Sequence, residues 1–305
     1  MTAAAPLRVA VLGARGIGFT HVRLFSAHGA QVTSILGSTR ATSESASENI
    51  RQGLGVVCAP FNDLEQILSQ DLDAVSICTP AALHFVHVRA ALDHRLPVFC
   101  EKPLFWQDGL SRALLEEQLN ELACHPCRRL FVNTSNAVFV AAVGDLLPPP
   151  EEVRCFRFCF HTRGKFKGRD IAIDLMPHGF SLLIEYLGIR PVTRFQSQVD
   201  IREYACSFDY GSCRAEFCFR ENPEGDRHLS FACDDREFTR VQEGAGLTYR
   251  VSLRDQTTGN LISVRDPFTV YIDKFIKYCY GISESVPDAF VQASANLRMM
   301  ADCTL

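Results

Sequence analysis

The sequence has no hydrophobic run long enough to cross a bilayer. Its longest obvious apolar stretch, AVFVAAV at 137–143, is far shorter than the roughly 20 residues of a membrane-spanning helix. The N-terminal segment MTAAAPLR also has none of the basic, apolar and small-residue zones of a signal peptide. From these two absences we expect a cytoplasmic protein without a membrane partner.

An excess of positive charge is also missing. The 31 lysines and arginines stand against 35 aspartates and glutamates, so the formal net charge is −4. A chain without a basic face cannot follow a phosphate backbone, and we expect no nucleic-acid partner. Its 305 residues, 47% of them hydrophobic, are enough to form two domains of ordinary size.

Cysteine is plentiful, but the pattern does not indicate a disulfide framework. The thirteen cysteines are an odd number, and Cys78 and Cys100 lie in apolar segments typical of small core residues in a reducing compartment. Cys124 and Cys127 form a C-x-x-C motif, which is either a redox pair or half of a zinc site. No second pair follows at zinc-ribbon spacing, and no histidine and carboxylate cluster has metal-ligand spacing, so we predict no metal site.

The first part of the chain alternates strand-like and helix-like segments, as parallel sheets with covering helices do. This alternation predicts a Rossmann dinucleotide-binding domain over residues 1–130. The Ser/Thr-rich run Ser38–Asn49 is either a loop or the start of a solvated helix. The expected strands are 7–13, 30–37, 73–79, 97–103 and 129–134, and the expected helices are 18–28, 63–70, 84–94 and 110–123.

The sequence pattern changes at Val153. From there on, short segments of alternating apolar and polar residues are joined by polar turns. This pattern predicts an α+β domain over 131–305 with a mostly antiparallel open sheet. The expected strands are 153–161, 204–210, 213–219, 228–233, 237–242 and 247–253. The expected helices are 175–187, with Gly188 as its stop, 268–280 and 288–302.

The loop LGARGIGFTH lacks the middle glycine of the fingerprint G-x-G-x-x-G. Backbone N–H groups at a turn from strand to helix attract a diphosphate, whereas a tight turn with no ligand is the alternative. We predict that this loop binds a dinucleotide, and that Arg15 lies either over the diphosphate or near the adenosine phosphate. The loop residues assigned to the cofactor are Gly13, Arg15, Gly16, Ile17 and Gly18.

A carboxylate for the ribose 2′-hydroxyl, expected about twenty residues beyond that loop, is absent as well. The chain has Ser38, Thr39 and Arg40 there, and two hydroxyls with a guanidinium suit a 2′-phosphate. We therefore predict NADP as the cofactor, with NAD as the alternative. If this prediction fails, the segment is a polar loop whose arginine faces water.

Residues 74–104 carry a more specific pattern. The strand ending in Thr79-Pro80, His84 on the next helix, Ala91-Leu92 near its end and Glu101-Lys102-Pro103 occur together, and His21 follows the glycine loop. This combination resembles the glucose-fructose oxidoreductase, inositol dehydrogenase and MocA (Gfo/Idh/MocA) family. The resemblance implies a Rossmann domain followed by a sheet domain. It also implies a cofactor site that includes Thr79, Pro80, His84, Glu101 and Lys102.

The resemblance further implies hydride transfer between NADP(H) and a carbonyl or hydroxyl carbon of a sugar, sugar derivative or cyclitol. The lysine that matches Lys102 reaches the nicotinamide in that family, and where the family has a cis peptide the following proline turns it inward. The resemblance also implies that the domain over 131–305 serves substrate binding and oligomerisation. Relatives commonly pair their sheet faces, which implies a homodimer or homotetramer.

The family's second signature, D-x-G-x-H-x-x-D, is matched in part by DLMPHGFS at Asp174–Ser181. Asp174 and His178 keep their spacing, but Met176 and Ser181 replace the glycine and the last aspartate. We expect Asp174 to be a helix N-cap, with Pro177 in the first turn and His178 held neutral near the helix N-terminus. A structural cap and a partly buried histidine are the alternatives.

In the catalysis that the resemblance implies, Lys102 donates a hydrogen bond to the carbonyl oxygen, His178 gives or relays the proton, and Asp174 orients the histidine. The sequence leaves open which of Lys102 and His178 is the formal acid. Loss of the last aspartate favours, as an alternative, reduction of an imine or another unsaturated group. A cofactor-binding sensor or partner subunit without turnover is the third interpretation. We expect His161 and 165–167, near the approach to Asp174, to form a solvated basic turn, and contact with the substrate is the alternative.

Overall fold

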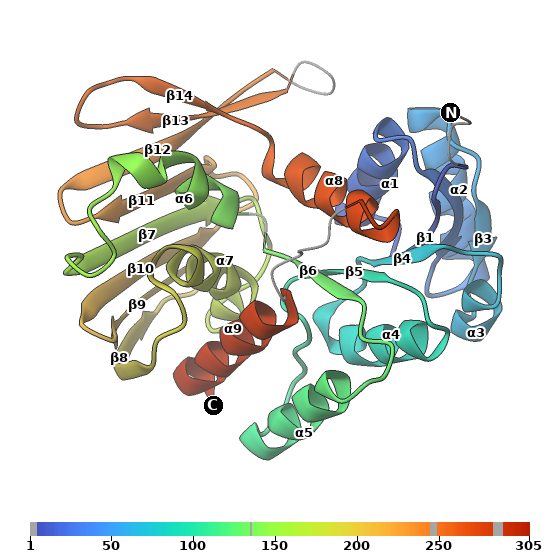
Figure 1. Cartoon of the computed structure of the whole chain (residues 1–305), viewed down its shortest axis with the longest axis horizontal. Coiled ribbons are helices and arrows are strands. Elements are labelled where there is room, and N and C mark those ends of the chain that lie inside the picture. The colour runs from blue at the N-terminus through green and yellow to red at the C-terminus, as the bar shows by residue number, and fades with distance from the viewer. Residues whose placement is uncertain (1–4, 135, 245–248, 283–288) are drawn as a thin grey trace. The chain divides into compact units, whose positions relative to one another are not determined.

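The computed structural model describes residues 5–134, 136–244, 249–282 and 289–305 and divides into two compact units. The first unit is the chain up to Asn133 together with Phe268–Ser294, and the second is Thr134–Pro267 with Ala295–Leu305 (Figure 1). The expected division at residue 130 differs, because a C-terminal segment returns to the first unit. Among the described helices, none is long and apolar enough to cross a membrane.

The first unit contains a parallel sheet of the Rossmann type, in the order β3-β2-β1-β4-β5-β6. Its central strands are buried along their length, as is typical of sheets covered by helices on both faces. The predicted fold is therefore confirmed for this part of the chain. The strands are β1 (Arg8–Leu12), β2 (Gln31–Leu36), β3 (Ala59–Phe61), β4 (Ala74–Ile77), β5 (Val98–Glu101) and β6 (Leu130–Asn133), and the helices are α1 (Ile17–Ala27), α2 (Arg40–Leu54), α3 (Leu64–Leu68), α4 (Ala81–Asp93) and α5 (Arg112–Ala123).

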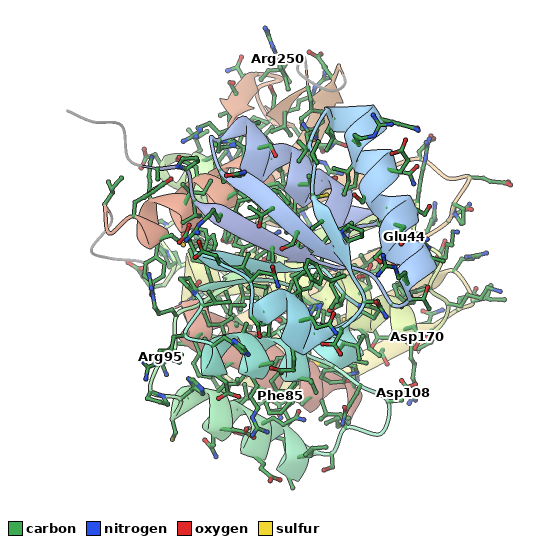
Figure 2. All side chains as sticks on the ribbon, turned by 90° about the vertical axis from the view of Figure 1, so that its right-hand side faces the viewer. Glu44, Phe85, Arg95, Asp108, Asp170 and Arg250 are labelled. Carbon is green, nitrogen blue, oxygen red and sulfur yellow. The ribbon has the colours of Figure 1, made fainter. Side chains whose placement is uncertain are left out.

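The Ser/Thr-rich run after β2 is mostly helix. Thr39 caps α2: its side chain accepts a hydrogen bond from the backbone N–H of Thr42, and the Thr42 side chain accepts one from the Thr39 N–H. This reciprocal pair satisfies two N–H groups that the first helical turn leaves open. Beyond it Ser43 is buried, whereas most of the other polar side chains face solvent, as Glu44 does on the outer side of α2 (Figure 2).

Helix α8 (Pro267–Cys279) packs on the Rossmann sheet, although the sequence analysis assigns it to the second domain. Its Phe275 ring lies 6.1 Å from Phe25, 5.3 Å from Phe99 and 6.1 Å from Phe131, measured between centroids. Aromatic rings at these separations bury large apolar areas. The alternation of apolar and polar residues along the sequence does not indicate that α8 packs on the sheet of the first unit.

The second unit is built on one sheet with the order β14-β13-β12-β11-β7-β10-β9-β8. Strands β7 and β10 pair in parallel and the other neighbours are antiparallel, which confirms the mostly antiparallel sheet. The elements are β7 (Cys155–Thr162), β8 (Val192–Val199), β9 (Glu203–Tyr210), β10 (Cys213–Glu221), β11 (His228–Cys233), β12 (Arg236–Glu243), β13 (Arg250–Asp255), β14 (Leu261–Val264), α6 (Ala137–Val143), a 3-10 turn (Gly144–Leu146) and α7 (Asp170–Leu187). Helix α9 (Ala289–Thr304) is divided, with its residues up to Ser294 in the first unit and the rest in the second.

Two strands of this sheet are not expected from the sequence. Strand β8 has mostly exposed side chains and β14 is short, so neither shows the apolar alternation that marks a half-buried strand. The first residues of the strand expected over 247–253 and residue 288 of the last expected helix lie outside the described residues.

Helix α7 begins at Asp170, which corrects the expectation that it begins after Asp174. Arg169 holds the N-cap position, and Asp174 lies inside the helix, with Pro177 in its interior. The buried Ile171, Ala172 and Leu175 carry the apolar face back beyond Asp174. We infer that this packing outweighs the roughly 3 kcal/mol that an interior proline costs.

The same helix packs closely on the inner face of the sheet. Phe180 contacts Phe208 and Phe217 with ring centroids 5.6 Å apart in each pair, and a Cβ added to Gly179 would lie 2.7 Å from the Phe217 ring and 3.0 Å from Phe158. Protein cores are dense enough that such a contact requires a shift of neighbouring groups.

We predict that Gly179→Ala lowers the free energy of unfolding by about 1–3 kcal/mol, because the added methyl group overpacks this contact. Urea unfolding followed by circular dichroism measures the change. Gly144→Ala is the control, since a Cβ there meets nothing within 4 Å and its backbone is right-handed helical. Helix propensity alone favours alanine by about 1 kcal/mol, so an unchanged or more stable Gly179→Ala protein would contradict the steric argument.

Candidate functional site

A cavity of about 490 Å³ lies at the carboxyl ends of β1, β2 and β4. Strand order reverses between β1 and β4, and ligands of open α/β sheets bind outside the carboxyl ends of the strands at such a point. Its lining includes Gly13, Arg15, Ser38, Thr79 and Pro80, so five of the predicted cofactor residues come together there.

The glycine loop is shaped by close approaches of the backbone. Gly13 has φ +84°, and a Cβ on it would lie 2.7 Å from the carbonyl oxygen of Cys78. A Cβ on Gly18 would lie 1.9 Å from the carbonyl oxygen of Gly13. Gly16 is the N-cap of α1 and Ile17 its first residue, so the positive end of this helix follows the loop directly.

The four polar residues assigned to the phosphates divide into two groups. Arg15 is exposed and lines the cavity together with Ser38. Thr39 instead caps α2, and the Arg40 guanidinium lies 2.7 Å from the Glu44 carboxylate, outside the cavity lining. Arg15 forms none of the ion pairs found within the described residues.

His84 is buried between two backbone carbonyls rather than facing the cavity. Its Nδ1 lies 2.8 Å from the Pro103 oxygen, and its Nε2 lies 2.6 Å from the Thr79 oxygen. Burial lowers the pKa of His84, so the neutral ring donates to one carbonyl at a time. His84 therefore ties the end of β4 to the turn that follows Lys102.

Glu101 is also buried, in a polar network that crosses the sheet. Its Oε1 accepts hydrogen bonds from His21 Nε2 at 2.8 Å and from Asn133 Nδ2 at 2.6 Å. The other ring nitrogen of His21 lies 2.8 Å from the Ser76 hydroxyl and 3.2 Å from the Cys78 sulfur. The network joins α1 to β4, β5 and β6 beneath the cavity.

The charges in this network stabilise each other. Burial disfavours the imidazolium, but hydrogen bonds to the Cys78 sulfur and the Glu101 carboxylate, together with the carboxylate charge, raise the pKa of His21 above its ordinary value. Burial also raises the pKa of Cys78 and keeps it a thiol, which leaves Glu101 as the partner that is charged at neutral pH. Although burial opposes ionisation of Glu101 too, hydrogen bonds and the charge of His21 lower its pKa below the usual carboxyl value.

Lys102 follows β5 directly and is half-buried. The Lys102–Pro103 peptide bond is cis. Its neighbours on either side are buried, so the backbone on both sides of the lysine is held by the core of the first unit.

Asp174 and His178 line a cavity of about 390 Å³ in the second unit. Four residues apart on α7, they lie on one face of the helix. The His178 ring stands edge-on to Phe160, with centroids 5.2 Å apart. Met176 and Ser181, which replace family positions, are buried, and the Ser181 hydroxyl donates to the His178 carbonyl oxygen at 2.7 Å.

Three arginines line the same cavity, and the sequence analysis does not identify them. Arg163, Arg227 and Arg240 come from two loops and from β12, and none of them forms an ion pair with a carboxylate in the described part of the chain. Burial lowers the pKa of Arg240 to about 10, so its guanidinium, 5.6 Å from the Phe160 ring centroid, is still protonated at neutral pH. His161 also lines this cavity, whereas 165–167 do not.

Comparison with known families gives a match over the first unit. Residues 7–124 match the model of the oxidoreductase family GFO_IDH_MocA, NAD-binding Rossmann fold. An inositol 2-dehydrogenase of Paenarthrobacter aurescens is 36% identical over 100 residues, which cover 32% of this chain and 28% of that protein. One of Rhodococcus erythropolis is 35% identical over 114 residues, 37% of this chain and 32% of that protein. The matches thus span about a third of these relatives or less.

Solved structures resemble the chain over nearly its whole length. A UDP-N-acetylglucosamine 3-dehydrogenase from Acidithiobacillus ferrooxidans has a TM-score of 0.71 at 17% identity, covering 98% of this chain and 97% of that one. A 3-ketoreductase from Actinomadura kijaniata, in complex with TDP-benzene and NADP, has a TM-score of 0.70 at 17% identity, covering 98% and 96%. At these identities the likeness concerns the fold.

We predict that stability falls as pH rises from about 6.5 to the raised pKa of folded His21, because His21 keeps its proton when folded and loses it near its ordinary pKa when unfolded. The stabilisation is complete below the unfolded pKa and lost as pH passes the folded one. One proton gives a slope of about 1.4 kcal/mol per pH unit. Urea unfolding across this range should show a flatter slope for Glu101→Gln, which removes the carboxylate that holds the proton.

The control for this experiment is Glu65→Gln. Glu65 pairs with His94 at 3.1 Å, but its side chain is 73% exposed, so its removal should leave the slope unchanged. Equal slopes for wild type and Glu101→Gln would contradict the buried pair as the source of the pH dependence.

Proposed function

We propose that the protein is an NADP(H)-dependent dehydrogenase of a sugar, sugar derivative or cyclitol, because residues 7–124 match the model of the GFO_IDH_MocA oxidoreductase family. The observation that carries this proposal is the 490 Å³ cavity at the strand ends, lined by Gly13, Ala14 and Arg15 of the loop that leads into α1. The names of the inositol 2-dehydrogenases that match the first unit support the substrate class.

The residues present fit a dinucleotide. Gly13 and Gly18 let the loop backbone pack closely on itself and on Cys78, and Gly16 has open space around it. The backbone N–H groups at the start of α1 are suited to a diphosphate. Arg15 and Ser38 line the same cavity, which favours a 2′-phosphate there and hence NADP over NAD. When bound, the cofactor supplies or accepts the hydride.

In the proposed reaction, residues of the chain stabilise the charge on the substrate and transfer the proton. Lys102 donates a hydrogen bond to the substrate oxygen and stabilises its developing negative charge during reduction. His178 gives or relays the proton, and Asp174, on the same face of α7, orients it. In the oxidation direction these groups take up the proton instead.

The lining of the 390 Å³ cavity narrows the substrate class that we propose. Arg163, Arg227 and Arg240 place three positive charges around the single carboxylate of Asp174. Guanidinium groups bind phosphate and carboxylate through paired hydrogen bonds. We therefore propose a sugar that carries an anionic group.

Two alternatives rest on the altered second signature. Ser181 is buried and bonded to a helix carbonyl, so it does not replace an aspartate that would hold a hydroxyl group. This favours, as a second candidate, reduction of an imine or another unsaturated group. A sensor or partner subunit that binds NADP without turnover is the other candidate, and it would use the first cavity alone.

We predict that Lys102→Ala keeps NADPH binding within about threefold but lowers turnover by about 100-fold or more, because the charge on the substrate oxygen loses its donor. Fluorescence of bound NADPH measures the first quantity. Its oxidation with a panel of neutral, phosphorylated and carboxylated keto-sugars, together with cyclic imines, measures the second.

The control is Lys277→Ala, which removes an exposed lysine paired with Asp273 in the same unit. Turnover of anionic keto-sugars above neutral ones supports the proposed substrate class, and turnover of imines alone supports the second candidate. Tight NADPH binding without turnover of any compound would support the sensor and contradict the proposed dehydrogenase.

We predict that Arg15→Ala weakens NADPH binding by about tenfold or more and NADH binding much less, since a charge-assisted hydrogen bond to the 2′-phosphate is lost. Arg51→Ala is the matched control, because Arg51 is exposed on α2 and pairs with Glu48. Equal weakening of both cofactors would move Arg15 to the diphosphate, and no weakening would show that it faces solvent.

A further inference from the structure

Three metal-ligand side chains lie on the face of the second-unit sheet opposite α7. Along β7 the side chains of Phe156, Phe158 and Phe160 are buried in the core, so those of Cys159 and His161 point to the other face. On β10, Cys218 lies between the buried Phe217 and Phe219 and faces the same way. None of these residues has a role in the proposed dehydrogenase reaction.

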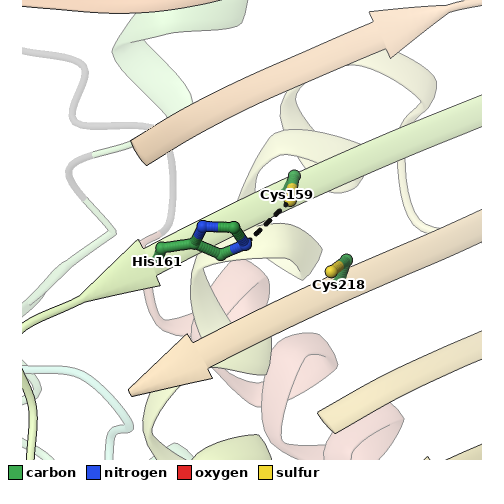
Figure 3. Close-up of side chains that lie close together, drawn as sticks. All are labelled: Cys159, His161 and Cys218. Atoms are coloured by element: carbon green, nitrogen blue, oxygen red, sulfur yellow. Dashed lines mark hydrogen bonds between the residues drawn. The ribbon is translucent and has the colours of Figure 1, made fainter. Parts of the chain in front are cut away.

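The parallel pairing of β7 with β10 brings the three side chains together. Cys218 is the direct partner of Cys159 in the register of the two strands. The Cys159 sulfur lies 3.3 Å from Nε2 of His161, and the ligand atoms of all three residues lie within 4.8 Å of one another. Figure 3 shows the two thiols and the imidazole side by side across the parallel strands.

We propose that Cys159, His161 and Cys218 bind a zinc ion. Zinc in proteins is held by thiolate and imidazole ligands, and two thiolates balance the charge of a divalent cation at a half-buried site. Tetrahedral bonds of about 2.3 Å to sulfur and about 2.0 Å to nitrogen place ligand atoms about 3.5–3.8 Å apart. The 3.3 Å between the Cys159 sulfur and His161 Nε2, and the 4.8 Å limit for the whole cluster, bracket these values.

The surroundings allow a metal ion to enter. Cys159 and Cys218 line a broad cavity of about 750 Å³ on this face of the sheet, and Cys218 is exposed. Both thiols are free, so no disulfide competes for the sulfur atoms. Three protein ligands leave a fourth tetrahedral position for water or another donor.

His161 connects the thiol cluster to the end of β7. The residue belongs to the lining of the 390 Å³ cavity at that strand end, while its ring lies with the two thiols on the opposite face of the sheet. Coordination through Nε2 would fix the orientation of that ring. Zinc binding itself does not depend on the proposed NADP(H) reaction, and it can be measured without any turnover.

The test uses the full chain, reduced and stripped of metal with a chelator, and titrated with Co²⁺. We expect one cobalt per chain, with the sulfur-to-metal charge-transfer absorption and intense visible bands of a tetrahedral thiolate site, and displacement by Zn²⁺. Cys218→Ser and His161→Asn should each weaken binding by about 100-fold or more, because a ligand is lost. Cys218 is exposed, so its serine variant should fold normally.

The control is a chain with Cys124→Ser and Cys127→Ser, which removes the other closely spaced thiol pair. Cobalt binding unchanged in this control and lost in Cys218→Ser supports the zinc site. The site is overturned if the bands disappear in the control instead. It is also overturned if wild type binds no cobalt while all thirteen thiols are shown to be reduced, or if Cys159 and Cys218 are found linked as a disulfide.

Discussion

The buried pair between Glu101 and His21 is the interaction on which the first unit depends. Taking an imidazolium and a carboxylate out of water is unfavourable unless each group is hydrogen-bonded, and here Asn133 and Ser76 provide the additional bonds. The four residues come from β5, α1, β6 and β4. Their mutual satisfaction fixes how these elements meet below the dinucleotide cavity, and Lys102 follows Glu101 directly in the chain.

This arrangement gives two motifs a physical meaning. The histidine after the glycine loop holds the carboxylate, which keeps the start of α1 beside the end of β5. His84 binds the backbone on the other side of Lys102. The chain thus holds the lysine from both sides through buried imidazoles, and neither ring needs to touch a ligand for the site to depend on it. Glu101 and His84 remain assigned to the cofactor site only by the family resemblance.

Much of the first unit could be predicted from the sequence, because its signals are local. Apolar runs mark the buried strands, and the glycines at 13 and 18 mark a turn in which backbone meets backbone. The sequence does not predict where α7 begins. Pro177 normally indicates the first turn of a helix, and only the packing of the residues before it shows that the helix extends back to Asp170. Helix α8 returns to the first unit through aromatic contacts that no local pattern encodes.

In the second unit, less of the candidate site could be predicted from the sequence. Arg163, Arg227 and Arg240 are scattered over loops and a strand, and only the fold brings them to one cavity. The spacing of Cys159 and His161 is too ordinary to indicate a ligand pair, and Cys218 joins them through the register of two strands. Sequence spacing reports neighbours along a chain, whereas these sites are made by neighbours across a sheet.

The parallel pairing of β7 with β10 also has a consequence for how the second unit forms. Strands that run the same way require the chain to cross back, and here α7, β8 and β9 lie between them in the sequence. The centre of the sheet therefore closes only after that whole segment has been placed. Such non-local pairing slows folding. We therefore expect the centre of this sheet to form more slowly than the hairpins at its β14 edge, and to limit the folding rate of the protein.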